Sequence, residues 1–181
     1  MNDLLLYIPK IDDLYFYQKM LADSETMAYN ASWFPPDGCI DFPKNKWKNW
    51  YYKWVNQVPR NFFAYLRLKE AGTFVGYVNY YYNSEKDWWD MGIVILGSER
   101  GKGYGKEGLF LLVDQAFKTK KITRLHNTFE TTRKAAYHIH KAVGFKDMET
   151  EDENIHHIVL TKDKYFESKL YRDCSIDVKK K

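Results

Sequence analysis

Two spacings of apolar side chains run along this 181-residue chain and predict short strands and amphipathic helices. Apolar residues alternate with polar ones or form short runs where a strand is expected, and recur every three to four positions where a helix is expected. The predicted strands are Leu4–Ile8, Asn61–Leu68, Thr73–Tyr82, Trp88–Leu96, Ile122–Phe129, Phe145–Met148 and Ile155–Thr161. The predicted helices are Ile11–Leu21, Lys44–Val55, Gly103–Lys118, Thr131–Val143 and Asp163–Tyr171.

The order of these segments predicts one mixed α/β domain over residues 1–181. Turn-forming residues fill Ala22–Pro43, which we expect to be a loop, and Lys69–Gly72 joins the second and third strands as a hairpin. No internal repeat or linker divides the chain. The three terminal lysines, Lys179–Lys181, are expected to form a disordered tail.

Charge and cysteine content exclude several classes of function. Lys and Arg (28) nearly balance Asp and Glu (24), and the formal charge of +4 predicts no binding to nucleic acid. Cys39 and Cys174 lack the spacing of a metal site or of a disulfide framework, so we expect no metal and a reducing, cytoplasmic environment. The first residues contain no basic leader and no apolar run approaches the ~18 residues of a membrane span, so no membrane association is expected.

A glycine-rich stretch between a predicted strand and a predicted helix carries the clearest chemical signal. Ile93–Leu96 ends in a turn, and Arg100-Gly101-Lys102-Gly103-Tyr104-Gly105 then opens the helix. Glycines let successive backbone N–H groups approach an anion, and the helix N-terminus adds its partial positive charge. This arrangement predicts a diphosphate site.

Other interpretations of this stretch fit less well. The ATP-binding pattern GxxxxGK[ST] is absent, because no Ser or Thr follows Gly105-Lys106. The dinucleotide pattern GxGxxG is matched over Gly103–Gly108, with Glu130 after the next strand as a ribose ligand. Its position in mid-chain, after a predicted antiparallel meander, argues against that fold. NAD binding and a purely structural turn stay open as alternatives.

The stretch Arg100-x-x-Gly103-x-Gly105 resembles the (Q/R)xxGxG/A diphosphate loop of the GNAT acyl-CoA N-acyltransferase superfamily. Downstream, Ala136, His140 and Gly144-Phe145 are similar to its second conserved helix, with His140 where a catalytic tyrosine is usual. The chain also resembles the branch that acetylates ribosomal-protein N-termini and small molecules. The resemblance implies a mixed central sheet of about seven strands flanked by helices, with a splayed pair of parallel strands that holds CoA. Acetyl-CoA would be the acetyl donor.

The resemblance also implies a set of cofactor contacts. Backbone groups of Val94 and Leu96 would hold the pantetheine arm, and the loop would bind the diphosphate mostly through its amides. Asn127, at the end of the next strand, and Arg133, in the following helix, would also reach the cofactor. The structural alternatives are a helix cap for Asn127 and a surface ion pair for Arg133. The expected cofactor-binding residues are Val94, Leu96, Arg100, Gly101, Lys102, Gly103, Gly105, Lys106, Asn127 and Arg133.

The implied reaction is direct attack of a neutral primary amine on the thioester carbonyl in a ternary complex. An ammonium group has no lone pair, so a base or a desolvated site must favour the free amine, and the departing thiolate needs a proton. Imidazolium His140 or Tyr137 would donate that proton, and Asp90, on the central strand, would act as the base at the substrate end. Each also has a structural explanation, namely helix packing for His140 and Tyr137 and a solvated strand edge for Asp90.

Aromatic and acidic residues in the N-terminal half supply the candidate acceptor site. In the family that the chain resembles, the first two helices and their loop cover the acceptor cleft. The candidate acceptor residues are Tyr29, Trp33, Phe34 and Asp37, with Asp41, Trp47 and Trp50 as a wider set. Rings and carboxylates suit a cationic amine, but aromatic residues at helical spacing also pack as a core.

The sequence therefore predicts an acetyl-CoA-dependent N-acetyltransferase acting on a primary amine, either a small molecule or a protein N-terminus. The alternative is a catalytically silent acyl-CoA-binding regulatory module, because His140 replaces the usual tyrosine. Exposed aromatic residues are compatible with a homodimer. The variable acceptor loops do not specify the amine.

Overall fold

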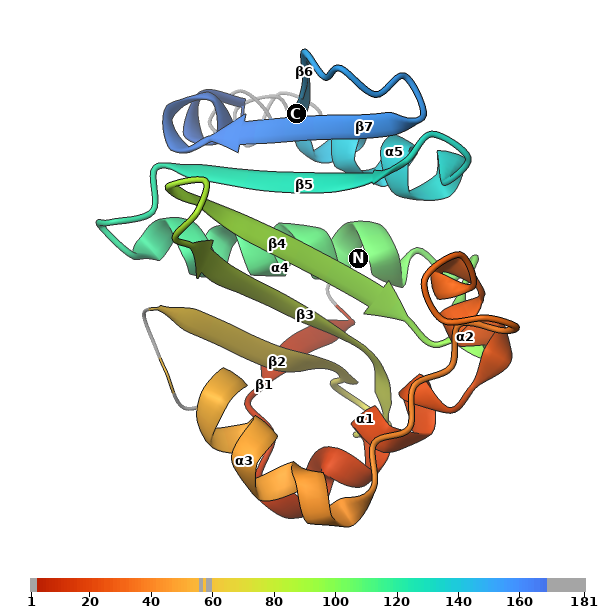
Figure 1. Cartoon of the computed structure of the whole chain (residues 1–181). Coiled ribbons are helices and arrows are strands. Elements are labelled where there is room, and N and C mark those ends of the chain that lie inside the picture. Colours follow the sequence, from red (N-terminus) through yellow and green to blue (C-terminus); the bar gives the residue numbers. More distant parts are fainter. Residues whose placement is uncertain (1–2, 56, 58–59, 169–181) are drawn as a thin grey trace.

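A single seven-stranded sheet organises the computed structural model, which describes residues 3–55, 57 and 60–168. The strands are ordered β1-β2-β3-β4-β5-β7-β6 across the sheet (Figure 1). Every neighbouring pair is antiparallel except β4 and β5, which run parallel. This pairing confirms the predicted mixed sheet and argues against the mostly parallel sheet of a dinucleotide-binding domain. The strands are β1 (Leu4–Tyr7), β2 (Asn61–Leu68), β3 (Phe74–Asn83), β4 (Trp88–Ile95), β5 (Arg124–Glu130), β6 (Lys146–Met148) and β7 (Ile155–Thr161).

Helices cover both faces of this sheet. Helices α4 and α5 pack on one face, and α1 and α3 pack on the other (Figure 1). Residues 162–168 are also helical. The α-helices are α1 (Leu14–Leu21), α2 (Ser24–Met27), α3 (Lys44–Trp54), α4 (Tyr104–Lys118) and α5 (Lys134–Val143). The 3-10 helices are η1 (Ile11–Asp13), η2 (Ala28–Asn30) and η3 (Gly97–Glu99).

The apolar run in β2 explains why both faces are buried. Phe62, Ala64 and Leu66 point into the core beneath α4, whereas Phe63 and Tyr65 pack with α1. Successive side chains of a strand point to opposite faces, so a continuous apolar run is typical of a strand covered on both sides. Burying each large apolar side chain of this kind stabilises the fold by roughly 2 kcal/mol.

Strands β4 and β5 separate toward the carboxyl end of β4. Their registered pair, Asp90 with His126, lies near the start of β4, and Figure 1 shows the two strands diverging beyond it. Leu96 N–H donates to the carbonyl of Val75 on β3, so by alternation the backbone groups of Ile93 and Ile95 point away from β3 and into the gap. This gap is where the cofactor was expected.

Residues 22–43 form more than the predicted loop. They contain α2 and η2, and the Asp23 carboxylate accepts a hydrogen bond from the backbone N–H of Thr26 at 2.9 Å, which caps α2. A helix of four residues is too short to show an apolar period, so the capping residue Asp23 was the sequence signal that could have predicted α2.

Most other boundaries agree with the prediction to within one residue, but the starts of α5 and β5 differ by more. Helix α5 begins at Lys134 and not at Thr131, because the Thr131 N–H donates to the Asn154 carbonyl at 2.8 Å. Strand β5 begins at Arg124, two residues later than predicted. The predicted tail Lys179–Lys181 and residues 169–171 of the predicted last helix lie outside the described residues.

The described part of the chain contains neither a helix that could span a membrane nor a cluster of possible metal ligands. No helix there is both long and apolar enough to cross a membrane. The same residues contain no group of three His, Cys, Asp or Glu side chains that could hold a metal ion.

Candidate functional site

The glycine-rich stretch forms the predicted turn between β4 and α4. Gly101 and Gly103 have φ angles of +79° and +86°, a left-handed conformation that residues with a Cβ adopt only at a cost. Gly103 is the N-cap of α4, so the free N–H groups of the first helical turn open toward the loop. The loop therefore has the geometry of an anion site at a helix N-terminus.

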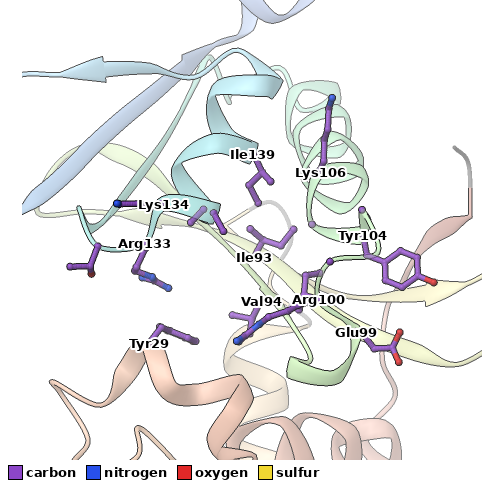
Figure 2. A pocket seen from close by; sticks show the side chains of 17 residues that line it. Tyr29, Ile93, Val94, Glu99, Arg100, Tyr104, Lys106, Arg133, Lys134 and Ile139 are labelled. Atoms are coloured by element: carbon purple, nitrogen blue, oxygen red, sulfur yellow. The ribbon is translucent and has the colours of Figure 1, made fainter.

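A cavity of about 600 Å³, here called the outer cavity, lies between this loop, the open half of β4 and the start of α5 (Figure 2). Its lining residues are Tyr29, Ile93, Val94, Ile95, Glu99, Arg100, Gly101, Gly103, Tyr104, Gly105, Lys106, Thr132, Arg133, Lys134, Ala135, Ala136 and Ile139. The carboxylate of Glu99 pairs with Lys102 at 2.9 Å, whereas Arg100, Lys106, Arg133 and Lys134 add positive charge. Glycines, helix N–H groups and excess cations suit the diphosphate of CoA.

Arg100 fastens the loop to α2. Its Nη1 and Nη2 donate to the carbonyl oxygens of Glu25 and Thr26 at 3.0 and 2.8 Å. The hydroxyl of Thr26 in turn accepts the N–H of Gly97 at 2.8 Å. Arg100 thus borders the outer cavity while linking it to the segment that carries Tyr29.

The backbone groups that face the gap belong to the residues next to those expected to hold the pantetheine. The N–H of Leu96 faces β3, and Val94 shares this orientation because it lies two residues earlier on the same strand. Ile93 and Ile95 offer their backbone groups to the gap instead. The side chain of Val94 still borders the outer cavity, whereas Leu96 and Lys102 do not line it.

A smaller inner cavity of about 240 Å³ adjoins the outer one and reaches toward β3 and β5. Five residues predicted from the sequence meet here, namely Tyr29, Val94, Asn127, Arg133 and His140. The full lining is Tyr29, Tyr77, Asn79, Gly92, Ile93, Val94, Ile95, Asn127, Phe129, Arg133, Ala136, Ile139 and His140.

His140 is buried and hydrogen-bonded at both ring nitrogens. Nδ1 lies 2.7 Å from the carbonyl oxygen of Ala136, to which it must donate. The backbone N–H of Thr128 donates to Asn127 Oδ1 at 2.9 Å, which identifies the amide oxygen and turns Nδ2 toward His140 Nε2, 3.0 Å away. Nε2 is therefore an acceptor, and the imidazole is neutral with its proton on Nδ1.

The protonation state of His140 does not support the expected imidazolium donor. Burial lowers the pKa of His140 to about 4, although the hydrogen bond to Ala136 acts in the opposite direction. A group with this pKa is almost entirely neutral at pH 7, and the lone pair of Nε2 is occupied by Asn127. His140 instead orients the amide of Asn127 at the wall of the inner cavity.

Tyr137 and Asp90 do not line either cavity. The hydroxyl of Tyr137 donates to Asp147 at 3.2 Å, and its ring stacks on that of His156 in β7. Asp90 accepts hydrogen bonds from Trp88 Nε1 at 3.0 Å and from Asn83 Nδ2 at 2.8 Å. Contrary to expectation, Asp90 lies at the paired end of β4, away from the glycine loop.

Among the four predicted acceptor residues, Tyr29 lines both cavities and the other three do not. Trp33 is 70% exposed, and its indole N–H donates to Glu130 at 3.3 Å. Phe34 is 47% exposed, and the Asp37 carboxylate accepts the N–H of Cys39. In the wider set, Asp41 is exposed, whereas Trp47 and Trp50 pack in the core beside α1.

One wall of the inner cavity was missed by the sequence analysis. It consists of Tyr77 and Asn79 on β3, with Gly92 directly opposite Asn79 on β4. The Asn79 amide has no hydrogen-bond partner among the described residues. A Cβ on Gly92 would lie 2.7 Å from Asn79 Oδ1, so this glycine makes room for the amide. The alternating positions of Tyr77, Asn79 and Tyr81 indicate that these side chains share one face of a strand. That Gly92 lies opposite Asn79 follows from the register between β3 and β4, which the sequence does not give.

Three tyrosines form a hydroxyl cluster beside this wall. The ring centroids of Tyr77 and Tyr17 are 5.2 Å apart, and the hydroxyl of Tyr77 interacts with those of Tyr17 and Tyr29. Burial raises the pKa of Tyr77 well above its ordinary value. Burial also raises the pKa of Tyr29, but the hydrogen bond to Tyr77 and the charges of Arg133 and Arg100 act in the opposite direction. Of the two phenols in the inner cavity, Tyr29 therefore has the better-stabilised anion.

Arg133 faces Tyr29 across the cavity (Figure 2). Its guanidinium carbon lies 4.3 Å from the centroid of the Tyr29 ring and 5.8 Å from that of Phe129. Nη1 pairs with Glu130 Oε2 at 3.3 Å. Arg133 thus brings positive charge and an aromatic contact to the place where the two cavities meet.

Comparisons with known proteins identify a family and a fold. The sequence profile of the family described as "Acetyltransferase (GNAT) domain" matches residues 3–146. No curated protein matches the chain.

Solved structures resemble the whole described architecture. Spermidine N-acetyltransferase from Vibrio cholerae, in complex with CoA and spermine, has a TM-score of 0.76 and 16% identity, covering 92% of this chain and 99% of that one. A GNAT-family acetyltransferase from Bacillus anthracis has a TM-score of 0.68 and 18% identity, covering 89% and 96%. A dodecameric form of the Vibrio cholerae enzyme has a TM-score of 0.68 and 16% identity, covering 91% and 97%. At these identities the likeness shows a shared fold and leaves the substrate open.

Proposed function

Because the chain belongs to the GNAT acetyltransferase domain family, and is thus an acetyl-CoA-dependent N-acetyltransferase, we propose that it acetylates a primary amine by direct attack in a ternary complex. The observation that carries this proposal is the pair of adjoining cavities. The outer one has the loop and charges for CoA, and the inner one adds an aromatic and polar wall for an acceptor. Two ligands can therefore meet where the cavities join.

The cofactor supplies an activated acetyl thioester, and the residues of the chain hold it. The N–H groups of Gly101, Gly103 and Gly105 face the diphosphate in this proposal, with Lys106 adding charge. Backbone groups of Ile93 and Ile95 hold the pantetheine as a strand-like neighbour of β4. Asn127, fixed by His140, contributes a second amide hydrogen to the same gap.

The inner cavity favours the reactive, neutral form of the amine. None of the described residues that line it is Asp or Glu, so no carboxylate among them stabilises an ammonium ion, and the guanidinium of Arg133 disfavours one further. Both effects lower the pKa of a bound amine toward the point at which the lone pair is free. A dedicated carboxylate base such as Asp90 is then unnecessary for the attack.

The departing thiolate receives its proton from Tyr29 in this mechanism. Tyr29 lines both cavities, and Tyr77, Arg133 and Arg100 offset part of the increase that burial causes in its pKa, which stays above the ordinary value. The surplus proton of the attacking amine then restores the phenol. Tyr29 thus takes the role of proton donor that the sequence suggested for His140 or Tyr137. The ring of His140 is neutral and bonded to Asn127, and the hydroxyl of Tyr137 is bonded to Asp147.

The proposal extends to the location of the enzyme and to its assembly. We propose a cytoplasmic enzyme, and a homodimer remains our expectation for its assembly. The dodecameric form of the Vibrio cholerae enzyme makes the oligomeric state worth measuring by light scattering. The acceptor is a small molecule or a protein N-terminus in this proposal.

Release of free thiol from acetyl-CoA tests the proposal. Purified protein is incubated with acetyl-CoA and a panel of amines, and amine-dependent thiol release is expected above the rate of spontaneous hydrolysis. Binding of CoA in calorimetry with no amine-dependent release across the panel would favour the silent acyl-CoA-binding module, whose motivation is His140 in place of a tyrosine. Binding of NAD and not CoA would refute both.

A further inference from the structure

The inner cavity contains one formally charged side chain, and that side chain is cationic. Among the described lining residues, Arg133 is the only Lys, Arg, Asp or Glu, and His140 is neutral. Its ion-pair partner Glu130 does not line the cavity. The two oxygens of Glu130 accept from Arg133 and from the indole of Trp33, each at 3.3 Å. The guanidinium of Arg133 therefore lines the cavity, whereas the carboxylate of Glu130 that pairs with it lies outside the lining.

Most of the donor capacity of Arg133 is unused. A guanidinium has five N–H donors in a planar fork, and one of them is hydrogen-bonded to a side chain or carbonyl of the described residues. The ring of Tyr29, whose centroid lies 4.3 Å from the guanidinium carbon, and the ion pair with Glu130 restrict the position of the fork. A planar, fixed fork with free N–H groups is the usual protein partner of a carboxylate or a phosphate.

A polycationic acceptor fits this lining poorly. Each additional ammonium group of a polyamine would lose its hydration without gaining a carboxylate, and would lie near Arg133. The aromatic face of Tyr29, which could receive a cation, is already taken by the guanidinium. The lining of the inner cavity is therefore cationic, whereas spermidine or spermine would require carboxylates there.

We propose that the acceptor is a small amine that also bears an acid group, and that this group pairs with Arg133. The inference rests on the proposed acetyl transfer and adds the class of its substrate. The inner cavity holds only about 240 Å³, so the acid group and the reacting amine must be few bonds apart, as in an α-amino acid or a small aminophosphate. The unpartnered amide of Asn79 and the rings of Tyr77 and Phe129 form the remainder of the acceptor wall.

Matched pairs of amines test this class. L-Phenylalanine is compared with phenylethylamine, phosphoethanolamine with ethanolamine, and spermidine stands for polycations, with thiol release giving kcat/KM. The acid-bearing member of at least one pair is expected to be about tenfold better or more, the size of one charge-assisted hydrogen bond. Which pair shows the difference separates a carboxylate from a phosphate.

A binding readout makes the test independent of turnover. Calorimetry on the CoA complex compares N-acetyl-phenylalanine with N-acetyl-phenylethylamine, and O-phospho-N-acetylethanolamine with N-acetylethanolamine. The acid-bearing member of the preferred pair is expected to bind about tenfold more tightly.

Two charge-removing variants locate the effect. Arg133→Met keeps a similar length without the charge, and is expected to bring the acid-to-neutral ratio close to one. Lys134→Met is the matched control, because Lys134 is the next residue and lines the outer cavity but not the inner one. Its ratio should stay at the wild-type value, whatever happens to CoA affinity. Arg133→Lys should restore part of the ratio.

The outcomes separate this inference from the proposed function. A preference for spermidine or for the neutral amines would overturn the inference while leaving acetyl transfer intact. An acid preference that survives Arg133→Met would overturn the assignment to Arg133. CoA binding without thiol release or product binding for any amine would refute the proposed function, and this inference with it.

Discussion

Tyr29 is the residue on which the proposed proton transfer depends. We expect Tyr29→Phe to lower kcat about 10- to 100-fold, the range for loss of a positioned general acid, while acetyl-CoA binding changes little because the ring and its contact with Arg133 remain. Steady-state kinetics and calorimetry measure the two effects separately. Tyr137→Phe is the matched control, since its hydroxyl is engaged with Asp147 outside the cavities. A larger loss in Tyr137→Phe than in Tyr29→Phe would refute the assignment.

Gly92 and Asn79 act as a pair at the acceptor wall. A methyl group on Gly92 would collide with the Asn79 amide at 2.7 Å, so Gly92→Ala is expected to raise the acceptor KM about as much as Asn79→Ala does, each roughly fivefold, with little change in CoA affinity. In the double variant the two effects should not add, because the first change already removes the amide from the cavity. Additive effects in this double-mutant cycle would show that the two residues act independently.

At the scale of elements, the strands and long helices were predictable because their apolar periods are long. The bounds of β2, α3 and α4 follow from eight or more patterned residues, and the glycine loop follows from its composition. The α2 segment escaped prediction because four residues carry no period. The acceptor wall escaped it for another reason: the pairing of Asn79 with Gly92 depends on the register between β3 and β4.

The orientation of backbone groups was likewise set by register. Val94 and Leu96 were expected to offer their amides to the cofactor, yet the bond from Leu96 N–H to Val75 turns both toward β3. The protonation state of His140 was also beyond prediction from the sequence. Its place in the helix was predictable, but its neutral state depends on burial and on Asn127, which only the packed structure brings together.

The loop between β4 and α4 allows conformational and steric roles of glycine to be separated. Gly103 has φ +86°, so Gly103→Ala is expected to strain the turn by roughly 1–2 kcal/mol and to weaken CoA binding about tenfold. Gly105 is helical, and its added Cβ would make an ordinary contact of 3.4 Å with Ile139. Gly105→Ala should therefore bind CoA nearly as wild type does and raise Tm, because alanine is the better helix former.

Calorimetry with CoA and thermal unfolding of the two glycine variants provide the comparison. Equal losses of affinity in both variants would indicate that crowding of the diphosphate by a Cβ, and not the left-handed turn, controls binding. Loss of affinity in Gly105→Ala alone would contradict the predicted role of Gly103.

At the scale of the whole molecule, the packing of helices on both faces of the sheet buries His126 and His140, and burial favours their neutral forms. Burial lowers the pKa of His140 to about 4, and burial together with the charge of His157 lowers that of His126 to about 4. In the unfolded chain both titrate near the ordinary value of about 6.5. Between these two values the unfolded state binds more protons than the folded state, so stability falls as the pH falls.

The pH dependence of unfolding tests this linkage. The stabilisation is fully present above pH 6.5, and it should be lost progressively as the pH falls from about 6.5 through 4, with His140 contributing on the order of 3 kcal/mol. Urea unfolding at several pH values measures the slope. His140→Gln removes the titration while retaining hydrogen-bonding groups, so its slope over this interval should be shallower than that of wild type, by up to about 1.4 kcal/mol per pH unit. His138→Gln, on the exposed face of the same helix, is the matched control and should keep the wild-type slope. An unchanged slope in His140→Gln would mean that His140 binds protons equally in the folded and unfolded states, which would contradict the neutral buried ring and reopen imidazolium donation by His140.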